Sequence, residues 1–281
     1  MIEKSKMIKI STFNVNSIKA RLPRFLEWIK LSNPDVICLQ ELKCEEHNFP
    51  LEAIMDAGYN CAVFGQKTYN GVAILSKYKI EDVVKGLPNF HFQNQLDWQA
   101  RYIEGLITIK NQVFRIASIY VPNGGGDLLL NQKLEDSIKF SYKMAFFQAL
   151  NQHISSLLEF DEKQIFCGDF NVAIDEIDIF NPKEFDGQIL FHPQERKWFR
   201  TILNQGLIDV YRKKNPNQIN YSWWDYRGNS YANNKGARID YILTTPSLLN
   251  EIKEVVIEDK NVRNQEKASD HCPVSLILDL P

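Results

Sequence analysis

The stretch KQIFCGDFNVA, residues 163–173, decides the fold class of this chain. Its first half is an apolar run of the length of a buried strand, and Gly168 and Asp169 end that run. Before it, residues 139–158 carry apolar side chains at helical spacing. A helix followed by a buried strand is the unit from which α/β proteins are built. The stretch therefore predicts an α/β fold.

The same order of elements occurs at the start of the chain. Residues 7–13 alternate like a strand, Leu22 and Pro23 open a helical stretch with the proline in its first turn, and residues 36–39 form a buried strand. The residues 110–112 form a tight turn between two strands, which implies a hairpin and hence antiparallel pairing. No linker separates the chain into halves, so we expect one mixed-sheet α/β domain over residues 1–281. Further strands are expected at 61–64, 72–75, 102–109, 113–121, 164–167, 238–243, 252–257 and 274–278, and a helix at 193–203.

Composition excludes several classes of protein. The 281 residues include 33 Lys plus Arg, 35 Asp plus Glu and 44% hydrophobic residues, which excludes disorder and a coiled coil. No apolar run of about 18 residues and no secretory signal is present, so we expect a soluble cytoplasmic protein. The five cysteines form no CxxC pair and are expected to be reduced core thiols. A net charge of -2 predicts no general attraction to nucleic acid, so any such contact needs a local basic face.

Polar residues gather where apolar strands end. Singly they are ordinary caps and turns, but together they place acids, amides and one histidine around one cleft. Their oxygen atoms suit a hard divalent cation such as Mg²⁺, and no Cys/His cluster indicates structural zinc. No phosphate-binding glycine loop or GxSxG elbow is present. The residues are Asn14, Glu41, Tyr120, Asn123, Asp169, Asn171, Asp270 and His271, with Asp240 inside a further strand.

The polar residues at these strand ends lie in six short motifs that follow one another along the chain. They are TFNVN (12–16), LQELK (39–43), YVPN (120–123), CGDFNVA (167–173), RIDY (238–241) and SDHCP (269–273), with SWWDYR at 222–227. Together they resemble the motifs of the exonuclease III-type apurinic/apyrimidinic (AP) endonucleases, and the resemblance spans nearly the whole chain. It implies the deoxyribonuclease I-like fold, a four-layered α/β sandwich of two mixed β-sheets flanked by helices.

The resemblance also implies roles for the site residues. Glu41 would be the principal Mg²⁺ ligand, with Mn²⁺ as a substitute, and Asp169 would orient or deprotonate the attacking water. His271 would contact the scissile phosphate, and Asp240 would fix its tautomer or charge. The general base and the number of metal ions stay open. The implied catalytic residues are Tyr120, Asp169, Asn171, Asp240 and His271, and the implied metal shell is Asn14, Glu41, Asp169, Asn171, Asp270 and His271.

DNA contacts are implied for a second set of residues. Gly126 stands where some relatives place a polar side chain that enters the DNA, and Ala237 where some have a bulky pocket residue, so substrate preference is less determined than the reaction. Leu42 replaces a threonine without affecting the ligand beside it. The implied DNA-binding residues are Arg101, Asn123, Trp223, Arg227 and Ile239. Basic residues near the motifs could line a phosphate track: Lys19, Arg21, Arg24, Lys67, Arg101, Arg196, Lys197, Arg227, Lys235 and Arg238.

The expected function is a Mg²⁺-dependent DNA repair nuclease of base excision repair. It would cut double-stranded DNA 5′ to abasic sites, with 3′ to 5′ exonuclease and 3′-end cleaning activity, as a monomer that is nucleoid-associated if bacterial. One rival is a hydrolase of phosphoinositides, sphingomyelin or RNA on the same sandwich, against which the 222–227 and 120–123 motifs speak. Another is a binding protein that has lost the chemistry, against which the intact acid and histidine set speaks.

Overall fold

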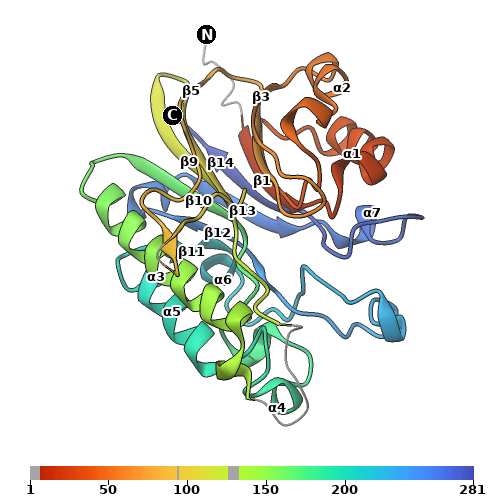
Figure 1. Cartoon of the computed structure of the whole chain (residues 1–281). Coiled ribbons are helices and arrows are strands. Elements are labelled where there is room, and N and C mark those ends of the chain that lie inside the picture. Colours follow the sequence, from red (N-terminus) through yellow and green to blue (C-terminus); the bar gives the residue numbers. More distant parts are fainter. Residues whose placement is uncertain (1–6, 94, 126–132) are drawn as a thin grey trace.

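The computed structural model describes residues 7–93, 95–125 and 133–281. Two six-stranded mixed sheets face each other, and helices cover the outer face of each (Figure 1). The first sheet has the order β13-β14-β1-β2-β4-β3 and the second β11-β12-β10-β9-β8-β5, while β6 and β7 form a small hairpin. The predicted four-layered α/β sandwich is confirmed. No helix among the described residues is both long and apolar enough to cross a membrane.

Most predicted elements lie within a residue or two of their observed bounds. The strands are β1 Met7–Asn14, β2 Val36–Gln40, β3 Asn60–Phe64, β4 Val72–Ser76, β5 Ile80–Lys85, β6 His91–Phe92, β7 Gln95–Leu96, β8 Tyr102–Ile109, β9 Gln112–Tyr120, β10 Lys163–Asp169, β11 Ile208–Asp209, β12 Asp240–Thr244, β13 Ile252–Ile257 and β14 Val274–Asp279. The α-helices are α1 Ile18–Ser32, α2 Leu51–Asp56, α3 Ile138–Leu157, α4 Pro182–Phe185, α5 Pro193–Leu203, α6 Val210–Lys214 and α7 Asp259–Val262. Short 3₁₀ turns are η1 Glu46–Asn48, η2 Leu134–Asp136, η3 Glu176–Asp178, η4 Arg227–Asn229 and η5 Pro246–Leu248.

The hairpin prediction is confirmed, and the predicted start of the first helix is wrong. β8 and β9 pair antiparallel, and Lys110 and Asn111 make the turn with φ of 48° and 62°, as a tight two-residue hairpin requires. The helix begins at Ile18, because the Ser17 side chain accepts a hydrogen bond from the Ala20 backbone N–H and caps it. Pro23 therefore lies inside α1 and not in its first turn.

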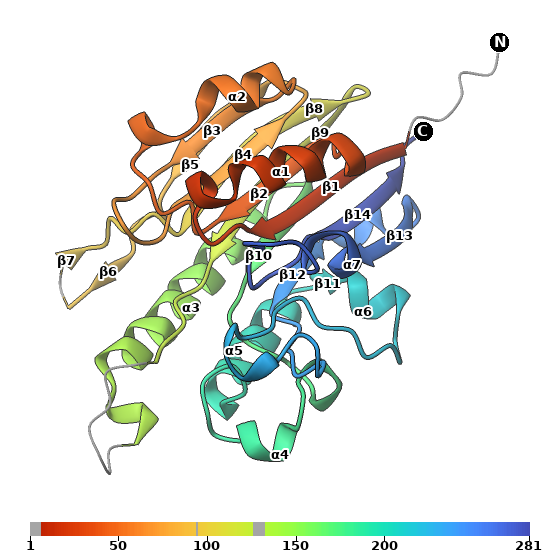
Figure 2. The ribbon, with the colours of Figure 1, turned by 90° about the vertical axis from the view of Figure 1, so that its right-hand side faces the viewer.

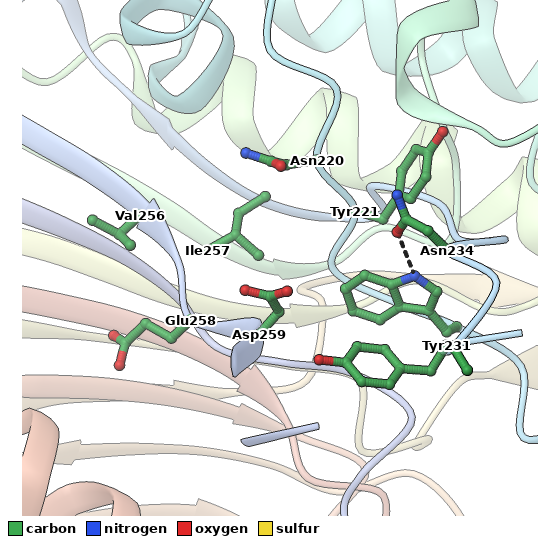
Figure 3. A pocket seen from close by; sticks show the side chains of 10 residues that line it. Asn220, Tyr221, Tyr231, Asn234, Val256, Ile257, Glu258 and Asp259 are labelled. Carbon is green, nitrogen blue, oxygen red and sulfur yellow. Dashed lines mark hydrogen bonds between the residues drawn. The ribbon is translucent and has the colours of Figure 1, made fainter. Parts of the chain in front are cut away.

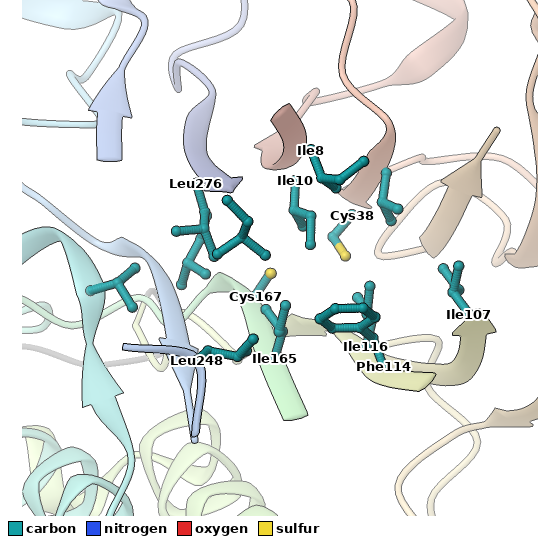
Figure 4. Close-up of a cluster of buried hydrophobic side chains, with 14 of the residues drawn as sticks. Ile8, Ile10, Cys38, Ile107, Phe114, Ile116, Ile165, Cys167, Leu248 and Leu276 are labelled. Carbon is teal, nitrogen blue, oxygen red and sulfur yellow. The ribbon is translucent and has the colours of Figure 1, made fainter. Parts of the chain in front are cut away.

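Three layers of apolar side chains hold the sandwich together. Between the sheets, isoleucines such as Ile10 and Ile165 and the thiols of Cys38 and Cys167 fill the central core (Figure 4). α1 and α2 pack on the outer face of the first sheet, and α3 and α5 pack on the outer face of the second (Figure 2). All five cysteines are free, and four of them are buried, as expected for core thiols.

Candidate active site

The site lies where strand ends of both sheets meet. In the first sheet β1 ends at Asn14, and Glu41 follows the end of the parallel strand β2. In the second sheet Asp169, the last residue of β10, pairs in register with Tyr120 of β9 and Asp240 of β12. Asn14 joins the sheets, because its Nδ2 donates to Asp169 Oδ2 at 2.9 Å and to Glu41 Oε1 at 2.9 Å. Strands of both sheets thus position one polar cluster.

Glu41 is held in a sharp turn beyond β2. Its backbone has φ 52°, in the left-handed region that is costly for a residue with a side chain. Lys43 Nζ lies 2.8 Å from Glu41 Oε2, an ion pair that the sequence reasoning missed. Burial alone would raise the pKa of Glu41, but the charge of Lys43 and the hydrogen bond from Asn14 outweigh it and lower this pKa. Glu41 is therefore ionised at neutral pH.

Asp169, Asp240 and His271 form a buried group of charged side chains. His271 Nδ1 lies 2.9 Å from Asp240 Oδ2, and His271 Nε2 lies 3.7 Å from Asp169 Oδ2. Burial lowers the pKa of His271, but the charges of Asp240 and Asp169 outweigh it and raise this pKa to about 10. Burial raises the pKa of Asp169 to about 7, with His271 opposing and Asp240 and Glu41 adding to the rise. The group thus pairs an imidazolium with a carboxylate that can exchange a proton near neutral pH.

The donor set fits a divalent cation. Ligand atoms of Glu41, Asp169 and His271 lie within 4.8 Å of one another. The buried Asp240 Oδ1 finds no hydrogen-bond partner within the described parts of the chain. Carboxylate oxygens favour Mg²⁺ or Mn²⁺, and a cation relieves the repulsion among three acids at this point.

Asn14 and Asp270, which are also expected in the metal shell, are both engaged in hydrogen bonds with neighbouring side chains or backbone. Asn14 turns its amide nitrogen to the carboxylates, while its Oδ1 accepts a hydrogen bond from the Asn16 backbone N–H at 3.0 Å. Asp270 accepts from Asn16 Nδ2 at 2.9 Å and from Trp223 Nε1 at 3.1 Å. As placed, Asn14 spans the two sheets, and Asp270 holds the indole of Trp223.

Two amides and a tyrosine stand beside the acids. Asn171 Nδ2 donates to Asp169 Oδ2 at 3.2 Å, and Asn171 Oδ1 accepts from Asn123 Nδ2 at 3.3 Å. Arg101 stacks over the Tyr120 ring at 4.8 Å. A hollow of about 810 Å³ is lined by Arg101, Tyr120 and Asn123 and extends to Tyr69, which is 67% exposed. The groove therefore reaches Tyr120, which pairs in register with Asp169.

The aromatic wall expected for a sugar pocket lies next to Asp270 and His271. Trp223 is half-buried against a small apolar cluster that contains Ala237 and Ile239, and its backbone pairs with those of Ala237 and His271. Ile239 is 1% exposed, so it supports this wall from behind. Arg227 is exposed and pairs with Asp225 at 2.7 Å.

Two of the residues discussed for DNA binding lie elsewhere or cannot be placed. Arg238 cannot line a phosphate track, because it is fully buried and its guanidinium binds Asp178 at 2.7 Å and Asp209 at 2.7 Å. A buried guanidinium between two carboxylates has a structural role. Gly126, the position considered for a side chain that enters DNA, lies outside the described residues.

A second hollow lies away from the acids. It measures about 710 Å³ and is lined by Tyr221, Trp224, Tyr231 and Asn234 on one side and by residues 256–259 on the other (Figure 3). Trp224 Nε1 donates to Asn234 Oδ1 at 3.2 Å inside it. None of the residues expected to carry the chemistry lines it, so the groove at Tyr120 is the candidate substrate cleft.

Comparisons with known proteins agree with this geometry. Residues 11–271 match the endonuclease/exonuclease/phosphatase family. Exodeoxyribonuclease III of Haemophilus influenzae is 31% identical, over 95% of this chain and 98% of its own length. The 3′ phosphatase NExo from Neisseria, bound to a product DNA hairpin, is 35% identical with a TM-score of 0.88, covering 97% of this chain and 100% of that one. An AP endonuclease from Archaeoglobus fulgidus is 34% identical with a TM-score of 0.86, over 97% of this chain and 100% of its own.

The match covers the whole region that forms the cleft. Both neighbouring structures share the paired mixed sheets, and the motifs that build the cluster lie between residues 12 and 273. The chain therefore belongs to the endonuclease/exonuclease/phosphatase family, as a nuclease of the exonuclease III type that its motifs resemble.

Proposed function

We propose that the protein is a Mg²⁺-dependent DNA repair nuclease that hydrolyses the phosphodiester 5′ to abasic sites in double-stranded DNA. Incision leaves a 3′-hydroxyl and a 5′-deoxyribose phosphate. The observation that carries the proposal is the buried group of Asp169, Asp240 and His271, which lies next to Tyr120, a residue that lines a groove of about 810 Å³. A groove of this kind admits a polymer backbone, and the cluster supplies the groups that phosphodiester hydrolysis needs.

The residues divide the chemistry between them. Asp169 orients and deprotonates the attacking water, since it is the buried carboxylate that lies between His271 and the amide of Asn171. The His271 imidazolium, held by Asp240, donates to a phosphate oxygen and stabilises the charge that develops there. Asn171 and Tyr120 donate further hydrogen bonds to the phosphate. Glu41 and Asp169 would hold Mg²⁺, with Asn14 and Asp270 next to them, and the cation would supply positive charge to the phosphate oxygens.

Lesion recognition is assigned to the wall at Trp223. Its indole, backed by Ala237 and Ile239, packs on a bare deoxyribose and leaves no volume for an attached base. Arg101, Asn123 and Arg227 contact the DNA backbone on the two sides of the cleft. We also propose that residues 1–281 act as a single domain and as a monomer, supported by the one core that the two sheets share. The five free cysteines support a reducing, cytoplasmic location, at the nucleoid in a bacterium.

A second activity is proposed at the same cleft. One structural neighbour is a 3′ phosphatase and another is an AP endonuclease, although both share this fold at similar identity. Two further activities, the cleaning of blocked 3′ ends and 3′ to 5′ exonuclease activity, need the same hydrolytic residues. In both, the phosphate that is attacked lies at the end of a strand and not in its interior. The groove at Tyr69 and Arg101 is open enough to take either substrate.

One experiment tests the proposal. Purified protein is incubated with a duplex that holds one abasic analogue, an intact duplex and a duplex with a 3′ phosphate, each with Mg²⁺ and with EDTA. We expect incision beside the lesion and release of the 3′ phosphate in Mg²⁺, and neither in EDTA. Absence of incision at the lesion under all conditions would overturn the proposed AP endonuclease activity.

A further inference from the structure

A lysine ammonium is buried behind Asn171 and Asn123, the two asparagines whose amides are proposed to bind DNA. Lys143, on α3, and Glu195, on α5, both have fully buried side chains, and Lys143 Nζ lies 2.5 Å from Glu195 Oε1. The same ammonium donates to the backbone carbonyl of Asn171 at 2.7 Å and to that of Asn123 at 3.1 Å. Three acceptors thus use the three hydrogens of one ammonium group.

This ion pair joins segments that are distant in sequence. Asn123 follows β9, Asn171 follows β10, and their side-chain amides hydrogen-bond to each other at 3.3 Å. Asn171 has a left-handed backbone with φ 50°, so the direction of its carbonyl must be held by an outside group. On the far side, Glu195 accepts a hydrogen bond from the His192 backbone N–H at 3.2 Å, which ties the pair to the start of α5. The pair therefore anchors both amides to two helices.

Stability alone is a weak reason for such a pair. Two charges lose their hydration when they are buried, and well-packed apolar side chains of similar volume often serve stability equally well. An apolar pair, however, would leave two carbonyls without donors and could not set their directions. The chain also packs closely here, since a Cβ added at Gly124 would lie 2.8 Å from Lys143 Cδ.

We propose that the Lys143–Glu195 pair is a positioning device that aims the amides of Asn171 and Asn123 at the phosphate in the transition state. The inference rests on the proposed function, because it assumes that these amides bind the reacting phosphate. Lys143 itself does not reach the substrate, since its side chain is completely buried and its three donors are used within the protein. Its effect passes through Asn171, whose Nδ2 donates to Asp169 Oδ2 and to the Val121 carbonyl at 2.9 Å, and through Asn123, whose Nδ2 donates one hydrogen to Asn171 Oδ1.

The test is a double-mutant cycle on incision of an abasic duplex. Lys143→Met should lower kcat by roughly 10- to 100-fold, the range typical of groups that orient reacting side chains. The Kd for the duplex in EDTA should change by less than about threefold, since the groove is intact. In an Asn171→Ala background the same Lys143→Met change should lower kcat by less than about threefold further, because the group it positions is gone. Activity is counted per folded molecule, from circular dichroism.

Two further variants keep the test decisive. Lys163→Met is the matched control, because it removes an ion pair of the same 2.5 Å length, with Glu251, at the opposite end of β10, and its kcat should equal that of the wild type. Lys143→Met/Glu195→Gln removes both charges and keeps an acceptor for the His192 backbone N–H, so it should fold and share the kcat loss.

The outcomes separate the inference from the function on which it rests. An inactive wild type would overturn the proposed function. An active wild type with unchanged kcat in Lys143→Met, or with equal losses in both backgrounds of the cycle, would overturn the positioning role alone. If neither Lys143→Met nor Lys143→Met/Glu195→Gln folds, the pair has a structural role, and the proposed positioning role is overturned as well.

Discussion

Glu41 shows how one residue carries both strain and charge. Its left-handed backbone, with φ 52°, turns the carboxylate away from β2 toward Asn14, and Lys43 keeps it ionised. A conformation of this kind costs about 1 to 2 kcal/mol and persists only where its surroundings impose it. A strained, charged residue beside two other acids is what the proposed role of Glu41 as a cation ligand requires.

The first prediction is that Glu41→Gln sharply reduces turnover at limiting Mg²⁺ and leaves the fold intact. The amide keeps the shape of the side chain but loses the charge that attracts the cation, so a higher Mg²⁺ concentration should be needed for the half-maximal rate. The check is the rate of incision against Mg²⁺ concentration, with the melting temperature as the control. A wild-type rate at limiting Mg²⁺ would show that Glu41 is not the principal ligand.

The second prediction concerns Trp223, whose indole nitrogen binds Asp270 Oδ2 at 3.1 Å and whose ring is only half-buried. Trp223→Ala should lose incision at abasic DNA far more than hydrolysis of a small chromogenic phosphodiester, because only the DNA substrate presents a sugar to the wall. Rates on both substrates are compared, together with thermal melting. Equal losses of rate on both substrates, with a fall of about 3 to 5 kcal/mol in the free energy of unfolding, would show that Trp223 is a core residue and not a pocket residue.

At the scale of elements, one buried carboxylate links the β8–β9 hairpin to α3. Glu104 on β8 accepts from the Tyr102 hydroxyl at 2.6 Å and lies 3.5 Å from Arg115 on β9 and 3.4 Å from His153 on α3. Burial acts to raise the pKa of Glu104, but the hydrogen bonds from His153 and Tyr102 and the charges of His153 and Arg115 outweigh it and lower this pKa. The ionised carboxylate therefore stabilises the contact between the second sheet and its covering helix.

The third prediction follows from this lowered pKa. The unfolded chain binds a proton at Glu104 near the ordinary value of 4.5, before the folded chain does, so this stabilisation is present above that pH and is lost as pH falls through the lower folded pKa. Glu104→Gln should lower the free energy of unfolding by about 1 to 3 kcal/mol at neutral pH. The difference from wild type should shrink in acid. Urea unfolding at both pH values measures it, and a difference that stays constant would show that the charge is not responsible.

The elements themselves differ in how well the sequence predicts them. Buried strands such as β10 are continuous apolar runs, and their bounds follow from that pattern within two residues. β5 was not predicted, because it is an edge strand with mostly exposed residues and an irregular register against β8. The predicted start of α1 is too late, because Pro23 is typical of a first helical turn and is a stronger sequence signal than the capping residue Ser17.

At the scale of the whole molecule, the site depends on how the two sheets face each other. Asn14 and Asp169 are 155 residues apart and meet at 2.9 Å, a proximity that no local pattern contains. The polar ends of apolar strands nevertheless predicted which residues would take part. Sequence patterns do not show the role of Lys143, because its partner Glu195 is 52 residues away and a lysine within a helix is ordinarily a solvated surface residue. They do not show the ion pair of Lys43 with Glu41 either, because the left-handed turn that brings these two side chains together is not visible in the sequence.

The central claim is that Asp169 activates the water that cuts DNA 5′ to an abasic site. The most direct test compares wild type with Asp169→Asn on a duplex that holds one abasic analogue in Mg²⁺, with the product ends identified. Wild type should leave a 3′-hydroxyl on one fragment and the abasic sugar phosphate on the other. The variant should bind the duplex equally well and cut it at least about 100-fold more slowly, as expected when a general base is removed. Incision by the variant at the wild-type rate, or other product ends from the wild type, would contradict the account.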